Sequence, residues 1–165
     1  MKLKMTAMLF VTSLVWSWAL TPPVASAQTV DPWTAIQQLQ ADLKADRQAV
    51  VAGNLPLTDG EARAFWPVYK AYRGEVEIVV DRLAKLIVAY ATNFETMDDT
   101  KADAFFTESV AIEREKLEVR ERNVPKIRAV LPAQKAARFF QIENKLDAIV
   151  NMSLAQQIPL VPLKK

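Results

Sequence analysis

The chain has 165 residues, of which 51% are hydrophobic and 24% are charged, with 21 basic residues against 19 acidic ones. It contains neither cysteine nor histidine. These absences exclude disulfides, thiol catalysis, Ser-His-Asp catalysis and the usual zinc, haem and copper ligand sets. The near-balance of charge gives no electrostatic reason to expect binding to nucleic acid.

Residues 1–27 have the pattern of a secretory signal peptide. Lys2 and Lys4 precede an apolar run that ends at a double proline. Ala25-Ser26-Ala27 follows, with small residues at the positions that a signal peptidase recognises before its cleavage site. Cleavage is expected after Ala27 and leaves a single domain of residues 28–165. The alternative is an uncleaved membrane anchor, because the apolar run is nearly long enough to cross a bilayer. The double proline favours cleavage, so we expect an exported protein with no further membrane span.

Four helices are expected in the exported domain, and no segment shows the alternation of a strand. The first begins at Asp31-Pro32, an N-cap followed by proline, and the second at Thr58, which forms a capping box with Glu61. Pro125 is expected to kink or end the third helix. The fold class is therefore all-α, with predicted helices over 32–52, 58–92, 98–123 and 132–156 and an extended tail over 157–165.

A ten-residue phrase occurs three times, as residues 57–66, 97–106 and 131–140. Each copy has an apolar residue, a helix-starting residue, a polar first turn, an alanine and then an aromatic pair. Neighbouring side chains diverge around a helix, so the two aromatics of a pair cannot both face one narrow seam. We expect the first aromatics in the core and the second ones either widening the core or lining an exposed apolar surface. The first aromatics are Phe65, Phe105 and Phe139, and the second are Trp66, Phe106 and Phe140.

The second helix carries apolar residues at an unbroken alternation of four and three from Phe65 to Tyr90, which is the spacing of a coiled-coil seam. Its length of roughly 50 Å, at 1.5 Å per residue, is large for so small a domain. We expect an elongated antiparallel assembly of long bent helices whose uncovered stripe pairs with a second copy, giving a cradle-like homodimer. The alternative is a compact four-helix bundle in which the second helix folds back at Gly74.

Two helix starts resemble a family motif. Small exported helical proteins of the Spy/CpxP-like periplasmic stress family carry Leu-Thr-x-x-Gln twice, each time at a helix start. Leu57-Thr58-Asp59-Gly60-Glu61 is similar to the first copy, with Glu61 in place of glutamine. Leu131-Pro132-Ala133-Gln134-Lys135 resembles the second, with Pro132 in place of threonine and Gln134 one position early. The tail from Gln141 to Val161 also resembles a group of uncharacterised exported proteobacterial proteins.

The resemblance implies a periplasmic, cradle-shaped dimer. Some members of that family are ATP-independent chaperones, while others inhibit a sensor kinase or sense metals through histidine, which this chain lacks. The motif residues also have a purely structural interpretation, because Thr58 and Glu61 can satisfy free amides while Leu57 and Leu131 pin the entering chain.

Exposed apolar side chains flanked by charge can hold unfolded segments without demanding a particular sequence, and basic residues nearby speed their capture. The charge run over 113–122 can also be a solvated helix face. The three glycines are scattered, so no phosphate-binding loop is expected. The candidate client-binding residues are Trp66, Phe106, Arg114, Arg120, Arg138 and Phe140.

These patterns favour a non-enzymatic, chaperone-like or envelope-stress protein that binds exposed apolar protein segments and needs neither cofactor nor metal. The alternative function is that of a dedicated adaptor or inhibitor, which docks on the exported domain of a sensor or of another envelope protein. Both functions require an exposed apolar surface, so the sequence does not separate them.

Overall fold

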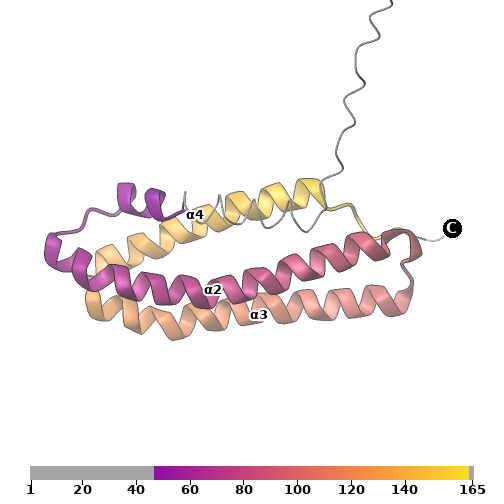
Figure 1. Cartoon of the computed structure of the whole chain (residues 1–165), viewed down its shortest axis with the longest axis horizontal. Helices are drawn as coiled ribbons and strands as arrows, with labels where there is room; N and C mark the ends of the chain where they lie inside the picture. The colour runs from indigo at the N-terminus through magenta and orange to yellow at the C-terminus, as the bar shows by residue number, and fades with distance from the viewer. Residues whose placement is uncertain (1–46, 164–165) are drawn as a thin grey trace, which may run out of the picture.

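The computed structural model describes residues 47–163 (Figure 1). Residues 47–54 are helical and are followed by α2 (Asp59–Asn93), the 3₁₀ turn η1 (Phe94–Thr96), α3 (Asp99–Val130) and α4 (Ala133–Gln157). No strand occurs within residues 47–163, which confirms the all-α prediction for this part of the chain. The predicted signal segment and residues 32–46 of the first predicted helix lie outside the described residues.

The long helices start where the capping residues predict. The Thr58 hydroxyl accepts a hydrogen bond from the Glu61 amide at 3.3 Å, and the Glu61 carboxylate accepts one from the Thr58 amide at 2.8 Å, so the capping box of α2 is complete. Asp98 caps α3 by accepting from the amide three residues further on, at 2.9 Å. Pro132 is the N-cap of α4 and makes no side-chain hydrogen bond there.

The third helix corrects the prediction that it ends near residue 123, because α3 continues through Pro125 to Val130. Proline removes the hydrogen bond to the carbonyl of Glu121, but both residues lie on an exposed face where water can replace that bond. The extra turns also bury Ile127, which is 0% exposed. Burial of this side chain outweighs the lost hydrogen bond.

The second helix is also continuous, with Pro67 inside it and Gly74 in its middle. The alternative fold in which the chain turns back at Gly74 is therefore wrong. A glycine lowers helix propensity by only about 1 kcal/mol relative to alanine, and packing on both sides of this point offsets that cost.

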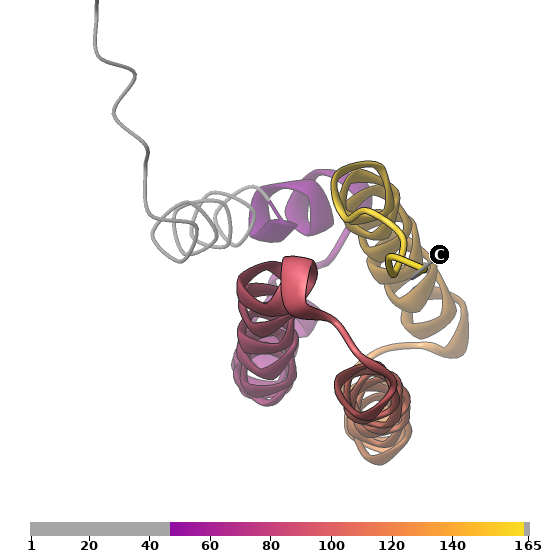
Figure 2. The ribbon, with the colours of Figure 1, turned by 90° about the vertical axis from the view of Figure 1, so that its right-hand side faces the viewer.

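The helices form an elongated bundle. In Figure 1, α2 and α3 run side by side in opposite directions, and α4 returns along the other side of the core. Figure 2 looks along the bundle and shows the helical residues 47–54 at the fourth corner, between α4 and α2. The buried core joins all four segments and contains Val51, Leu55, Phe65, Tyr69, Tyr72, Val76, Val79, Ile112, Val119, Ile127, Leu131, Ala136 and Phe139.

The apolar stripe of α2 is covered by the same chain. Its two leucines are half-buried and pack against the core, and its other members are at most 5% exposed. The helices α3 and α4 thus cover the stripe that was expected to pair with a second copy of the chain. An uncovered stripe on α2 therefore no longer supports the predicted homodimer. The buried members are Phe65, Tyr69, Tyr72, Val76, Val79 and Tyr90, and the half-buried ones are Leu83 and Leu86.

The tail leaves the helix as predicted. Ile158, the C-cap of α4, has an extended backbone. The Tyr90 hydroxyl then donates a hydrogen bond to the Pro159 carbonyl at 3.0 Å, which holds the tail against the C-terminal end of α2. Residues 164–165 lie outside the described part of the chain.

Candidate functional site

Aromatic side chains from α2 and α4 form one cluster inside the bundle. The Phe139 ring lies at its centre, with its centroid 5.3 Å from that of Phe65, 6.0 Å from Tyr69 and 5.9 Å from Tyr72. All three contacts are edge-on, the arrangement that aromatic rings prefer. Phe65 and Phe139 are 0% exposed, which confirms their predicted place in the core.

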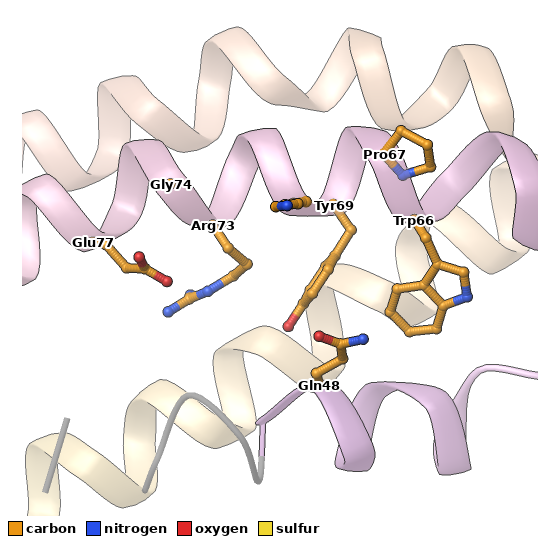
Figure 3. A pocket seen from close by; sticks show the side chains of 8 residues that line it. Gln48, Trp66, Pro67, Tyr69, Arg73, Gly74 and Glu77 are labelled. Carbon is orange, nitrogen blue, oxygen red and sulfur yellow. The ribbon is translucent and has the colours of Figure 1, made fainter. Parts of the chain in front are cut away.

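A groove of about 670 Å³ opens beside the first half of α2 (Figure 3). The Trp66 and Tyr69 rings form an apolar wall, with their centroids 5.3 Å apart and their planes nearly perpendicular. Arg73 and Glu77 make the other end polar, and Gln48 of the first helical segment lies beside Tyr69 and Trp66. The groove can accept a chain with one apolar and one polar part.

A cluster of buried charges lies next to this groove. The Glu143 carboxylate on α4 is 0% exposed, and its Oε2 accepts hydrogen bonds from Arg47 at 3.0 Å and from Arg73 on α2 at 3.1 Å. Arg47 reaches further to Asp147 at 3.0 Å. The same aspartate binds Arg120 of α3 at 3.3 Å and pairs with a lysine of that helix. One charge cluster therefore ties together four helical segments.

The sequence interpretation missed this cluster, although a signal was present. Arg47 stands four residues before the buried Val51, and Glu143 stands four residues after the buried Phe139. Each charged residue therefore occupies a core position of its helix. A buried charge requires an opposite charge nearby, so an ion pair between Arg47 and Glu143 could have been predicted from the sequence.

The tyrosines beside this cluster have altered acidity. Burial raises the pKa of Tyr69 and of Tyr72 from 10.0 to about 12, and the negative charge of Glu143 adds to the effect. Both hydroxyls are therefore expected to stay protonated in the folded protein when an exposed tyrosine would ionise.

This acidity predicts a loss of stability in alkali. Below pH 10 both the folded and the unfolded chain keep these phenolic protons, so no penalty arises. Between pH 10 and about 12 the unfolded chain releases them while the folded chain holds them, so the free energy of unfolding falls as the pH rises. Denaturant titrations across this interval measure the fall. A Tyr69→Phe/Tyr72→Phe variant should lose less stability over the same interval, and an equal loss would contradict this account.

An exposed apolar stripe runs along the outer face of α3. Phe106 is 66% exposed, Val110 43% and Leu117 54%, and their spacing of four and seven residues places them on one side of the helix. Charged Glu113 and Arg114 lie between them in the sequence, and both are exposed. Both lie three or four residues from Val110 and from Leu117, so this face presents apolar side chains with both signs of charge among them.

The six candidate binding residues do not gather in one site. Trp66 lies near the start of α2, whereas Phe106 lies near the start of the antiparallel α3 and Arg114 lies at the middle of α3. The starts of antiparallel neighbours are at opposite ends of a bundle, so Trp66 and Phe106 belong to two separate surfaces. Trp66 is half-buried and contributes to both the core and the groove, while Phe106 lines the exposed stripe.

The other three candidates are engaged inside the chain. Arg120 pairs with Asp147 as described, and the Arg138 side chain donates to the backbone carbonyl of Asn54 at 2.6 Å. Phe140 packs against the core and so widens it. The charge run over 113–122 is likewise more than a solvated face, because Glu115, Lys116 and Arg122 also pair with α2 or α4. Phe105, predicted to be in the core, is half-buried, with its ring 4.6 Å from that of Tyr90.

The two helix-start motifs meet in space. The Lys135 ammonium of the second motif binds the Glu61 carboxylate of the first at 2.5 Å, and this contact lowers the pKa of that carboxyl. Leu131 is buried, Leu57 packs against the core, and Gln134 is exposed. The motif residues therefore connect the starts of α2 and α4, in agreement with their structural interpretation.

Within residues 47–163 no three acidic side chains are placed to hold a metal ion, and no helix has the length and apolar character needed to cross a membrane. Comparison of the chain with protein-family models, with curated proteins and with solved structures finds no match.

Proposed function

We propose that this protein is a helical binding protein that holds exposed apolar segments of other polypeptides without ATP. The observation that carries the proposal is the α3 stripe of Phe106, Val110 and Leu117, which stays exposed although the core beside it is filled. Exposed apolar side chains gathered on one side of a helix favour contact with another apolar chain. The charges of Glu113 and Arg114 keep such a complex soluble.

The proposal also covers where the protein is located and which family it is related to. We infer export to the periplasm from the signal pattern of residues 1–27, and kinship with the Spy/CpxP-like stress proteins from the paired helix-start motifs. A binding role without catalysis is consistent with a chain that lacks histidine and cysteine. The homodimer stays a prediction, which light scattering of the purified chain tests.

The stripe predicts a specific loss of function. A Phe106→Ser/Val110→Ser/Leu117→Ser variant should lose most of its ability to suppress aggregation of a chemically unfolded client, because the apolar contact area is removed. Light scattering of the client at several chaperone ratios measures this ability. The fold should survive, since all three side chains are exposed.

The matched control is Ile78→Ser on α2. Ile78 is 67% exposed, as much as Phe106, but it lies on another helix. This variant should suppress aggregation like the wild type. If the triple variant and the wild type suppress aggregation equally, and have equal helix content by circular dichroism, the proposal is contradicted.

A dedicated adaptor is the second candidate, and the shortness of the stripe favours it. Three side chains on one side of α3 suit contact with one helix of one partner. If the protein is an adaptor, the wild-type chain used as bait should bind a single partner from envelope extracts in stoichiometric amount. The triple variant should not bind this partner. An adaptor should also leave generic unfolded clients unprotected.

A further inference from the structure

The outer face of α4 carries a regular stripe of basic and apolar side chains. Its members follow one another at steps of four and three residues, so they lie along one side of the helix. Ile142 is half-buried and packs against the core, whereas Ile149 and Met152 are 66% and 62% exposed. The members of the stripe are Arg138, Ile142, Lys145, Ile149 and Met152.

The acidic residues of α4 do not reach this face. The helix has two of them, Glu143, which is 0% exposed, and Asp147, whose side chain is 17% exposed. Cations from other helical segments neutralise both carboxylates. Glu143 binds Arg47 and Arg73, and Asp147 binds Arg47 and Arg120. The outer face of α4 therefore presents positive charge without an exposed carboxylate of the same helix.

The tail after α4 has the same chemical character. Residues 148–165 include two lysines and no acidic residue. Leu160 and Leu163 are 90% and 91% exposed, and the Tyr90 hydroxyl holds the chain just before them, at the Pro159 carbonyl. Figure 1 shows this tail beyond the end of α4. Two leucines thus stay in solvent at the end of the bundle that the exposed apolar part of the stripe also approaches.

A shallow groove of about 250 Å³ lies along the stripe. Val50 of the first helical segment, Ile142 and Ile149 supply its apolar lining, and Arg138 and Lys145 supply positive charge. None of the described residues that line it is acidic. The two basic residues are seven positions apart, which is about 10 Å along a helix. An anionic headgroup can lie between them with its hydrocarbon part over the apolar lining.

We propose that the outer face of α4 and the tail dock on a lipid bilayer with anionic headgroups, on which the protein lies without crossing it. Apolar side chains on one face of a helix enter the boundary between headgroups and acyl chains, and lysine and arginine attract anionic lipid phosphates. The α3 stripe does not offer this chemistry, because the exposed carboxylate of Glu113 lies among its apolar residues and is repelled by an anionic surface. The two exposed surfaces therefore have different partners.

Vesicle binding tests the proposal. The purified protein should co-sediment with vesicles of equal parts phosphatidylglycerol and phosphatidylcholine, and far less with vesicles of phosphatidylcholine alone. Added salt should weaken the binding, because it screens the attraction between the basic residues and the lipid phosphates. Equal binding to both kinds of vesicle would overturn the proposal. Binding to neither kind would also overturn it, and the positive face would then suit an acidic protein instead.

An Ile149→Ser/Met152→Ser/Leu160→Ser/Leu163→Ser variant should bind the anionic vesicles about tenfold more weakly, because it loses the side chains that enter the bilayer. All four side chains are exposed, so helix content by circular dichroism should not change. A Lys145→Gln variant should bind more weakly and depend less on salt. Every variant keeps the same N-terminal residues, so a difference between variants reports on α4 and the tail. Wild-type affinity of the quadruple variant would refute the proposal.

The matched control is the Phe106→Ser/Val110→Ser/Leu117→Ser variant of the α3 stripe. It should bind vesicles like the wild type, while the quadruple variant should still suppress client aggregation. This exchange of effects separates lipid docking from the binding of apolar polypeptide segments. If the α3 variant loses vesicle binding as strongly as the quadruple variant, docking on α4 is contradicted. It is also contradicted if lipid binding is absent and light scattering shows a dimer that only the quadruple variant loses, because this face would then join two copies.

Discussion

Replacing Glu143 by glutamine is expected to lower the free energy of unfolding by about 3 kcal/mol, the lower end of the range for breaking a buried ion pair. The carboxylate is 0% exposed and bridges Arg47 and Arg73. Glutamine keeps the shape but leaves two guanidinium groups close together without this counter-charge. Asp147 still binds Arg47, which limits the loss. Chemical denaturation followed by far-ultraviolet circular dichroism measures the change.

The matched control is Glu108→Gln in the ion pair between α3 and α2. Glu108 accepts two hydrogen bonds from Arg82, at 2.6 and 2.8 Å, so its geometry is at least as good as that of Glu143. Its side chain is 37% exposed, however, and water replaces a lost partner there. The Glu108 variant should lose much less stability. Equal losses at the two sites would show that burial does not control the strength of these pairs.

A Phe139→Ala variant is expected to lose about 3–5 kcal/mol of stability. The ring is 0% exposed and makes edge-on contacts with Phe65, Tyr69 and Tyr72, so its removal leaves a cavity at the centre of the aromatic cluster. These three rings come from α2 and cannot close the space unless α4 moves. Thermal and denaturant unfolding measure the loss.

The same substitution at Phe106 is the control. Phe106 belongs to another copy of the repeated phrase, but it is 66% exposed. We expect Phe106→Ala to change stability by no more than about 0.5 kcal/mol, as is usual for surface positions. It should instead weaken client binding. A large loss of stability in Phe106→Ala would mean that the stripe is part of the core.

The helix starts were predictable because capping is a local property. Thr58, Glu61 and Asp98 act within one turn, and no tertiary contact is needed to recognise them. The end of α3 was not predictable in this way. Pro125 weakens the helix locally, but the burial of Ile127 decides the outcome, and that burial depends on neighbouring helices.

The surface was harder to predict than the core. The three copies of the phrase are alike in sequence, yet Phe140 packs inward and Phe106 faces solvent. The difference arises because α2 and α4 meet at their starts, where Glu61 binds Lys135, whereas α3 starts at the other end of the bundle. A repeat fixes where a helix begins, but not which neighbour covers it.

Site-specific photo-crosslinking tests the binding surface most directly. A photoreactive phenylalanine analogue placed at position 106 or 117 should form adducts with an unfolded client, while the same analogue at position 78 should form few. These three positions are comparably exposed, so exposure alone cannot produce the difference. Equal adduct yields at 78 and 106, or none at either stripe position, would contradict the assignment of the α3 stripe as the surface that holds apolar segments.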